Sequence, residues 1–336
     1  MSRCALQGEE LSIGYLHGTR GKTVVAENLD LELYRGEVVC LVGPNGVGKS
    51  TLLRTLTGLQ PALSGAVTIN GDDIQNLGIR ERARSIGVVL TERVNAGVLP
   101  AFDLVALGRH PHTDWTGRLT HDDIEAIKWA LDSVGAADLR DRNVNELSDG
   151  ERQKIMIARA LAQEPAIIVL DEPTAFLDLP RRVEILGLLK KLTRTTDRAI
   201  LLSTHDLDLA IRAADTMWLM DSTGTIRSGA PEDLILRGEL ETVFAGDGVS
   251  FDREHGSFHL TTEIKGYIRL EGEDYAAVWT RRALRREGID VSEESRFVVR
   301  ISACSGGFYW NLDSGDTIVQ CNSIYDLITR LREYSF

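Results

Sequence analysis

The sequence has 336 residues, which is enough for two domains of ordinary size or three small ones. With 38 Lys and Arg against 50 Asp and Glu, the formal net charge is −12, which argues against a protein that binds nucleic acid by neutralising phosphates. Hydrophobic residues make up 43% and charged residues 26%, as in a folded protein rather than a disordered one.

The chain shows neither a membrane-spanning segment nor a cysteine-based metal site. No stretch of 18 apolar residues occurs, and residues 1–12 lack the apolar core of a signal peptide, so we expect the chain to stay in the cytosol. The four cysteines have no metal-ligand spacing, and we expect free thiols. Cys304 and Cys321 fall on predicted strands of one small domain, where they could lie close together.

The first 245 residues alternate between predicted strands and helices. An apolar run at 38–42 ends at Gly43-Pro44 and predicts a strand buried on both faces, followed by a helix from about 48 to 58. Further strands are predicted at 11–15, 29–33, 67–71, 166–170 and 199–203, and a helix follows the last of them to about 214. This alternation predicts an α/β fold with a largely parallel sheet.

Residues 93–150 interrupt this pattern with a helical insert. Thr120, followed three residues later by Asp123, predicts a capping box, and Gly135 is expected to end the helix that it starts. The residues expected on the buried face of that helix are Ile124, Ile127, Leu131 and Val134.

Residues 246–336 are predicted to form a separate, small α+β domain. They hold 12 of the 20 aromatic residues, so this segment should have a core of its own. Strands are predicted at 267–270, 297–302, 307–312 and 317–320, with a helix at about 274–287. A last helix should begin near Ser323 and bury Ile324, Leu327, Ile328 and Leu331.

Residues 43–51 fit the phosphate-loop pattern G-x-x-x-x-G-K-[ST], placed as required between a strand and a helix. Glycines allow a tight turn in which backbone N–H groups face phosphate oxygens, and the helix N-terminus favours negative charge. The residues expected to bind nucleotide phosphates are Gly43, Pro44, Asn45, Gly46, Gly48, Lys49, Ser50 and Thr51. Lys49 should reach the β- and γ-phosphates and the Ser50 hydroxyl should bind Mg²⁺; the alternative is a glycine-rich turn that matches by chance.

Asp171 and Glu172 follow a buried strand at the sheet edge where α/β proteins bind ligands. Asp171 would hold Mg²⁺, directly or through an intervening ligand, and Glu172 would orient and polarise an attacking water. An acidic pair after a strand is usually a solvated loop, but the preceding phosphate loop makes that alternative weak.

Residues 147–151, Leu-Ser-Asp-Gly-Glu, resemble the signature motif of ATP-binding-cassette (ABC) ATPases. Three further residues match family positions in order: Tyr15 for the aromatic residue that stacks on adenine, Asp178 for the D-loop aspartate and His205 for the switch histidine. The resemblance covers about residues 8–240. It implies a P-loop ABC-type nucleotide-binding domain with a helical insert, whose cofactors are ATP and Mg²⁺.

The resemblance also implies how two chains act together. Ser148 and Gly150, at the start of the signature helix, would face the γ-phosphate bound by a second copy of the chain, so that two copies close head to tail over two ATP molecules. His205 would bond the γ-phosphate. The alternative for Ser148 is helix capping only, since Ser148 and Glu151 also form a capping box.

The sequence departs from the family pattern at two places. Thr91 stands where the family has a glutamine in the loop that enters the helical insert, and the neighbouring Glu92 is then a candidate Mg²⁺ ligand. Asp149 and Glu151 place two carboxylates near a triphosphate, which requires that they turn outward or meet Arg152 or Arg159.

The signature variant and the fragment at 105–111 resemble importers of iron-siderophore, haem or cobalamin. In that fragment and at the preceding Leu104, we expect Leu104, Val105 and Leu107 to be buried and Arg109 and His110 exposed. The resemblance implies separate transmembrane permease subunits, a periplasmic or surface substrate-binding protein and a place on the cytoplasmic face of the membrane.

The alternatives are the ATPase of an exporter and a soluble ABC protein. Residues 246–336 would be regulatory, or a stabilising appendage.

Overall fold

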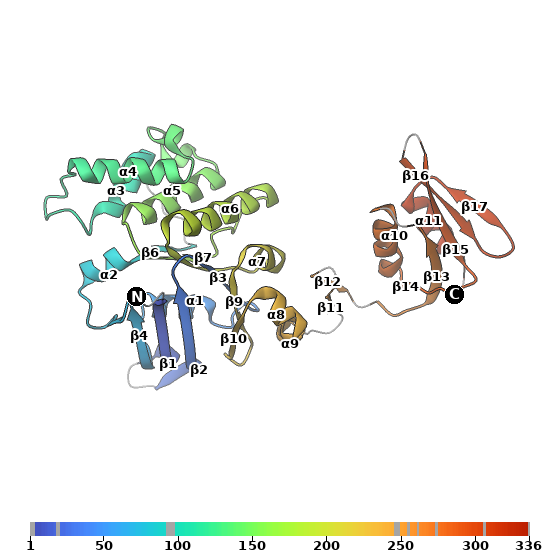
Figure 1. Ribbon diagram of the computed structural model, residues 1–336, viewed down its shortest axis with the longest axis horizontal. Coiled ribbons are helices and arrows are strands. Elements are labelled where there is room, and N and C mark those ends of the chain that lie inside the picture. The colour runs from blue at the N-terminus through green and yellow to red at the C-terminus, as the bar shows by residue number, and fades with distance from the viewer. Residues whose placement is uncertain are drawn as a thin grey trace. The chain divides into compact units, whose positions relative to one another are not determined.

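The computed structural model describes residues 4–17, 21–91, 98–244, 249–253, 256–260, 262–272, 275–304 and 307–334 (Figure 1). They form two compact units. Unit 1 comprises Met1–Phe244 and Arg253–Gly256, and unit 2 comprises Ala245–Asp252 and Ser257–Phe336. Within the described residues, no helix combines the length and the apolar character needed to cross a bilayer.

A six-stranded sheet with the order β10-β9-β3-β8-β7-β6 forms the centre of unit 1. Its strands are β3 (Val38–Val42), β6 (Ile86–Val89), β7 (Ile167–Asp171), β8 (Ala199–Ser203), β9 (Thr216–Met220) and β10 (Ile226–Gly229). All neighbours are parallel except β9 and β10. Every residue of β3, β7 and β8 is buried, which explains their continuous apolar sequences and confirms the predicted parallel sheet.

The helices of this layer follow the strands in chain order, as α/β folds require. They are α1 (Lys49–Leu56), α6 (Leu179–Thr196), α7 (Leu207–Ala213), α8 (Pro231–Leu236) and α9 (Glu239–Phe244). The predicted end of the first helix is confirmed, because Gly58 has a φ of 68° directly after the last turn of α1.

A second, antiparallel sheet in unit 1 has the order β2-β1-β4-β5. Its strands are β1 (Cys4–Leu16), β2 (Lys22–Tyr34), β4 (Ser64–Ile69) and β5 (Asp72–Asp73). The strands predicted at 11–15 and 29–33 are therefore parts of much longer ones. Leu29, Leu31 and Leu33 are buried at alternate positions and pack in one core with the parallel sheet.

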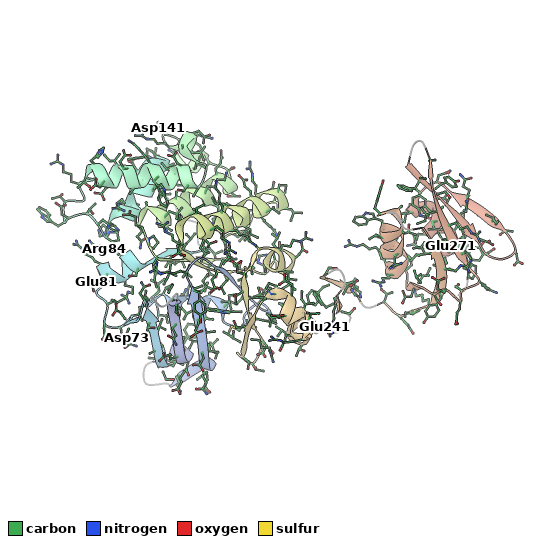
Figure 2. All side chains as sticks on the ribbon, viewed as in Figure 1. Asp73, Glu81, Arg84, Asp141, Glu241 and Glu271 are labelled. Atoms are coloured by element: carbon green, nitrogen blue, oxygen red, sulfur yellow. The ribbon has the colours of Figure 1, made fainter. Side chains whose placement is uncertain are left out.

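The predicted insert consists of helices in its described residues. They are α3 (Ala101–Ala106), η2 (Leu107–Arg109), α4 (His121–Ser133), η3 (Ala137–Leu139) and η4 (Val144–Glu146). A further helix, α5 (Asp149–Ala162), begins at the predicted end of the insert and continues past it. The capping box is confirmed, since Thr120 accepts from the Asp123 backbone and Asp123 accepts from the Thr120 N–H. Helix α2 (Ile79–Ser85) precedes the insert, and its Arg84, labelled in Figure 2, donates to the Pro111 carbonyl.

Two expectations for the insert are wrong: Arg109 is buried and Leu107 is 59% exposed. The cause lies at Gly108, where a Cβ would stand 2.2 Å from the Arg159 carbonyl oxygen of α5. Because η2 packs this closely on α5, Arg109 turns inward and Leu107 outward. The Arg109 guanidinium donates to Asp123 Oδ1 at 2.8 Å, the Ala162 carbonyl at 2.6 Å and Glu164 Oε2 at 2.7 Å.

Substitution of Arg109 by Met should destabilise unit 1 by about 3–5 kcal/mol, because it leaves the buried Asp123 carboxylate without its partner. Burial raises the pKa of Asp123, but hydrogen bonds from Thr120 and Arg109 outweigh burial and lower it overall. This stabilisation is complete above the pKa of an unfolded Asp, about 3.9, and is lost as the pH falls through the folded-state pKa. Urea unfolding of the variant measures the loss. Arg118→Met, at an exposed position in the same insert, is the control and should change stability by less than about 0.5 kcal/mol.

Unit 2 has a five-stranded sheet with the order β14-β13-β15-β16-β17. The strands are β13 (Gly266–Glu271), β14 (Ile289–Val291), β15 (Val298–Cys304), β16 (Gly307–Asp313) and β17 (Ile318–Cys321), and the helices are α10 (Tyr275–Arg286) and α11 (Ile324–Leu331). A separate hairpin pairs β11 (Val249–Asp252) with β12 (Ser257–Leu260). The predicted strands and helices are confirmed within a few residues of their ends.

The core of unit 2 lies between its sheet and its helices. Trp310 of β16 is buried and donates from Nε1 to Thr280 Oγ1 of α10 at 2.8 Å. Helix α11 buries Leu327, Ile328 and Leu331 as predicted, while Ile324 is half-buried.

Alternate residues of the unit 2 strands that point away from this core carry charge. Arg300 pairs with Glu271, which is labelled in Figure 2, at 2.9 Å, and with Asp313 at 3.1 Å. Cys304 and Cys321 are both free thiols, the first exposed and the second buried.

Candidate functional site

The predicted phosphate loop connects β3 to α1. The Lys49 side chain turns back into the loop, where its Nζ donates to the carbonyl oxygens of Gly43 at 2.8 Å and Pro44 at 2.9 Å. The side chain is buried, with only 7% of the residue exposed. The loop therefore holds an ammonium group whose hydrogen-bond acceptors are neutral carbonyls.

Two glycines of the loop are required by the surrounding structure. A Cβ on Gly43 would lie 2.2 Å from the Met220 carbonyl oxygen, and one on Gly48 would lie 2.1 Å from Cγ1 of Val25. Gly48 also has a φ of 113°, which L-residues rarely adopt. The loop thus closes tightly against β9 and β2, which fixes its backbone at the start of α1.

Burial lowers the pKa of Lys49, while the nearby carboxylates of Glu172 and Asp171 act in the opposite direction. A buried cation without an ion pair is costly, and an anionic ligand would remove that cost. A phosphate group bound at the helix start fits this environment, because the first N–H groups of α1 face the same loop.

Asp171 ends β7 and is buried. Its Oδ1 accepts from Ser203 Oγ of the adjacent strand β8 at 2.6 Å and from Ser50 Oγ of α1 at 3.2 Å. Two of the three side chains predicted to bind Mg²⁺ thus meet. Among the described residues no three His, Cys, Asp or Glu side chains cluster as metal ligands. One carboxylate and one hydroxyl suit Mg²⁺, which takes its other ligands from water and substrate phosphates.

Glu172 follows at the turn after β7 with a φ of 49°, a left-handed conformation that is uncommon for a residue with a side chain. Its N–H donates to Ser203 Oγ at 2.9 Å. The carboxylate Oε2 lies 3.7 Å from Nδ1 of His205, and both side chains are partly exposed. Glu172, after β7, and His205, after β8, therefore lie at the same solvent-accessible edge, beside Asp171.

Ser203 is a site residue that the sequence analysis missed. Its hydroxyl donates to Asp171 Oδ1 and accepts from the Glu172 backbone N–H, and so holds the turn at the end of β7 in place. The available signal was a polar residue that ends an apolar strand, at 203, where the neighbouring strand end carries Asp171.

Tyr15, near the end of β1, lies beside the first turn of α1. Its hydroxyl and Thr51 Oγ1 are 2.7 Å apart, and the residue is 42% exposed. An aromatic ring held next to the phosphate loop and open to solvent can stack on a planar base.

The signature segment starts α5. Ser148 caps the helix and Glu151 completes the capping box. Asp149 lies 3.5 Å from Arg152, and Glu151 lies 3.3 Å from Arg142. Each acid of the segment is thus neutralised by an arginine, and for Glu151 the arginine is one that the sequence analysis did not consider.

In the described residues, no hydrogen bond or ion pair joins Ser148 or Gly150 to the phosphate loop within one chain. Asp178 caps α6 by accepting from the Arg181 N–H at 3.1 Å. The Arg181 side chain in turn lies against Gly150: a Cβ added to Gly150 would be 3.3 Å from Arg181 Cδ. The D-loop aspartate and the signature segment are thus joined through Arg181.

Thr91 follows β6, and its Oγ1 donates to the Asp171 backbone carbonyl at 2.8 Å. Thr91 therefore lies at the site, whereas Glu92 falls outside the described residues.

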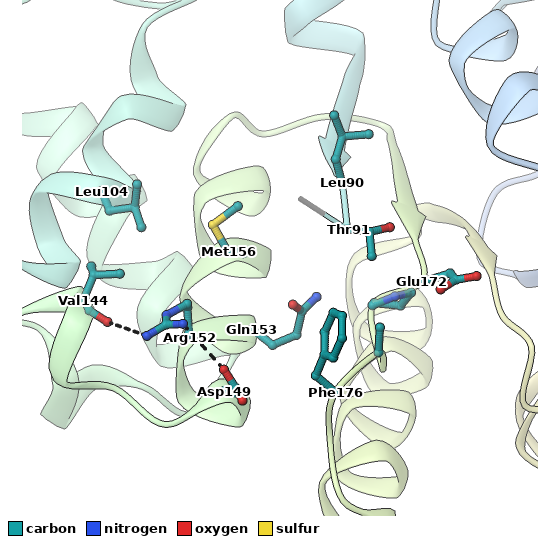
Figure 3. A pocket seen from close by; sticks show the side chains of 12 residues that line it. Leu90, Thr91, Leu104, Val144, Asp149, Arg152, Gln153, Met156, Glu172 and Phe176 are labelled. Carbon is teal, nitrogen blue, oxygen red and sulfur yellow. Dashed lines mark hydrogen bonds and ion pairs between the residues drawn. The ribbon is translucent and has the colours of Figure 1, made fainter. Parts of the chain in front are cut away.

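A cavity opens beside Thr91 between α5 and the loop after β7 (Figure 3). It is lined by Leu90, Thr91, Leu104, Val144, Asp149, Arg152, Gln153, Met156, Glu172, Pro173, Ala175 and Phe176.

Comparisons with known proteins agree with this geometry. Residues 26–175 match the ABC transporter family, and residues 265–332 match the iron ABC transporter C-terminal domain. The ferric enterobactin transport ATP-binding protein of Escherichia coli is 38% identical over 71% of this chain and 86% of its own length. The iron(3+)-hydroxamate import ATP-binding protein of Bacillus subtilis is 36% identical over 72% and 88%. A bacterial ABC transporter cassette solved as a dimer is 25% identical, with a TM-score of 0.57 over 67% of this chain and 98% of the cassette.

Proposed function

Since this chain belongs to the ATP-binding proteins of ABC transporters, we propose that it is the ATP-hydrolysing subunit of a membrane importer for an iron chelate. The observation that carries the ATPase assignment is the convergence of Lys49, Ser50, Asp171 and Glu172 at one sheet edge. A cation, a hydroxyl and two acids are the groups that phosphoryl transfer to water requires.

In this proposal each side chain has a distinct task. Lys49 exchanges its carbonyl partners for oxygens of the β- and γ-phosphates. Glu172 accepts a hydrogen bond from the attacking water and takes up its proton. His205 contacts the γ-phosphate from the same edge, and Tyr15 stacks on the adenine.

Ser50 and Asp171 would hold Mg²⁺ in the same proposal. When bound, the ion neutralises charge on the β- and γ-phosphates. The hydrogen bond between Ser50 and Asp171 shows that the two oxygens already converge.

A second copy of the chain completes the site. Ser148 and Gly150 stand at the N-terminus of α5, where the helix dipole favours an anion. This helix start is suited to the γ-phosphate bound by the partner copy. The dimeric cassette among the similar structures supports this arrangement, and Asp178 would lie at the same interface.

The importer assignment is supported by the relatives, whose names specify ferric enterobactin transport and iron(3+)-hydroxamate import, and by the match of residues 265–332. The chain would act at the cytoplasmic face of the membrane with separate permease subunits. A periplasmic or surface binding protein would deliver the chelate to them.

Reconstitution tests the direction of transport. The chain is purified with its membrane partner and inserted into vesicles loaded with a radiolabelled ferric siderophore, with the ATPase facing outward. ATP added outside should release the label, because an importer moves substrate toward its ATPase. Release that needs no ATP, or accumulation of external label in the lumen, would contradict an importer of this substrate; the second result favours an exporter.

We assign residues 1–245 to the ATPase domain and 246–336 to a regulatory domain. Unit 2 has its own core of apolar residues from β13, β15, β16, α10 and α11, as a ligand-responsive module needs. Removal of residues 246–336 should abolish the slowing of transport at high concentrations of chelate on the ATPase side, and leave the rate at low concentrations unchanged. The measurement is the vesicle assay at both concentrations. Equal slowing with and without these residues would make them an appendage that only stabilises the chain.

A further inference from the structure

Helix α10 of unit 2 has two sides of different character (Figure 1). Its buried residues are small or apolar: Ala276, Ala277, Thr280, Ala283 and Leu284. They recur every three or four residues, as one side of a helix requires, and three of them belong to the core of unit 2. The other seven of the 12 residues of the helix are all exposed. The outer side of α10 is formed by these seven residues.

The N-terminal half of this outer side carries apolar side chains. Tyr275, Val278 and Trp279 are 70%, 54% and 55% exposed. Their spacing of three and four residues places them next to one another on the helix. The Tyr275 ring packs edge-on against Phe308, with ring centres 5.1 Å apart, which fixes the ring beside the helix. The outer side therefore offers two aromatic rings and a valine to a partner.

The C-terminal half of the outer side is basic. Its residues are Arg281, Arg282, Arg285 and Arg286, and the helix contains no acid. Arg285 pairs with Asp252 at 3.1 Å. In the part of the chain that the structure describes, the other three arginines form no ion pair. The following acid, Glu287, is held by Arg332 at 2.7 Å. Positive charge on this side is thus left for an external anion.

We propose that the outer side of α10 docks on an anionic lipid surface, with Tyr275 and Trp279 among the headgroups and the three arginines on lipid phosphates. Tyr and Trp are enriched at membrane–water interfaces, and a basic amphipathic helix is typical of membrane-surface binding. The planar guanidinium of arginine matches phosphate oxygens. Val278 favours lipid over a nucleic-acid backbone, because a valine gains from apolar contact and cannot stack on a base.

The acidic character of the rest of unit 2 does not prevent this contact. Residues 246–336 have 11 Lys and Arg against 15 Asp and Glu, a formal charge of −4. At physiological ionic strength, charges separated by more than about 8 Å are largely screened, so the charge of the docking helix dominates at the surface. The inference goes beyond the proposed function, because lipid binding by α10 requires neither ATP nor a transported chelate.

Co-sedimentation of the full chain with vesicles, without nucleotide, tests the proposal. The chain should bind vesicles made of equal parts of phosphatidylcholine and phosphatidylglycerol, should not bind phosphatidylcholine alone, and should bind less as salt is added. Arg282→Gln should weaken binding about fivefold, the contribution of one arginine near an anionic surface. The matched control is Arg296→Gln. Arg282 and Arg296 are both exposed and stack on a ring, Trp279 and Phe297, but Arg296 lies outside α10. The control should change binding less than twofold.

Tryptophan emission reports which surface touches the lipid. Anionic vesicles should shift the emission of the unmodified chain to shorter wavelength, because the Trp279 ring leaves water. Trp279→Phe should remove this shift and keep an aromatic ring on α10. Trp115→Phe is the control, since Trp115 is 92% exposed in unit 1 and should leave the shift unchanged.

Three results would overturn the inference. The first is no binding of the full chain to anionic vesicles, and the second is equal binding by Arg282→Gln and Arg296→Gln. The third is an emission shift that survives in Trp279→Phe, which would place the lipid contact on another surface. If the chain forms dimers without nucleotide and Trp279→Phe does not, a second copy covers α10 and the inference also fails. The ATPase rate of each variant in solution should equal that of the unmodified chain, so these results leave the proposed function intact. Absence of ATPase activity in the unmodified chain would instead contradict the proposed function.

Discussion

Replacement of Glu172 by glutamine should abolish ATP turnover and leave ATP binding intact. The carboxylate lies at the strand-end turn beside Asp171 and His205, where it can take a proton from water. An amide of the same size cannot accept that proton. General-base catalysis contributes about 10²–10⁴-fold in rate, so we expect a loss of that order in phosphate release. The backbone at 172 keeps its left-handed conformation, because Glu and Gln have equal demands on φ.

The same variant should also accumulate as a dimer. ATP that is bound but not hydrolysed continues to favour the closed pair of chains, so light scattering with ATP and Mg²⁺ should show twice the mass of the ligand-free protein. Glu125→Gln provides the matched control, because Glu125 pairs with Lys128 on the exposed face of α4. It should hydrolyse ATP at the normal rate. A Glu172→Gln protein with normal turnover would remove Glu172 from the role of base.

Replacement of Lys49 by alanine should weaken ATP binding itself. The Lys49 ammonium is buried at the loop with carbonyl partners, ready to donate to phosphate oxygens. A hydrogen bond to a charged group contributes about 1.5–3 kcal/mol, so the dissociation constant should rise roughly tenfold to a hundredfold. Calorimetric titration with ATP in the Glu172→Gln background measures binding without turnover.

A thermal measurement gives an independent check of the Lys49 prediction. ATP should raise the melting temperature of the unmodified chain, and the same ATP concentration should raise that of Lys49→Ala much less, because ligand stabilisation follows affinity. Lys191→Ala, an exposed position on α6, is the control and should respond to ATP as the unmodified chain does. Unaltered ATP affinity in Lys49→Ala would contradict the phosphate-loop assignment.

Local patterns were enough to predict much of the fold and the first half of the site. The phosphate loop is a continuous segment between a buried strand and a helix, so its residues meet because the chain connects them. Asp171 is the last of the five buried residues of β7, and Glu172 follows it directly. Tyr15, Ser148, Asp178 and His205 came as site residues from the resemblance to ABC ATPases and not from a local pattern.

Other features depended on contacts between distant segments. Ser203 joins the two acids only because β8 pairs with β7, and a strand's neighbours are not written in its own sequence. The burial of Arg109 follows from Gly108 approaching the backbone of α5, some fifty residues away. The sequence pattern around 105–111 gave no sign of this approach, so the expected exposure of Arg109 was wrong.

The sequence by itself determined which segments become buried strands and helices and which residues form the phosphate loop, because both follow from short-range periodicity and turn chemistry. Only the tertiary structure decided that Ser50, Asp171 and Ser203 share hydrogen bonds, and that Gln153 of α5 lines the same cavity as Glu172. The physical reason is that sheet pairing and helix packing bring together side chains whose separation along the chain carries no information about their distance in space.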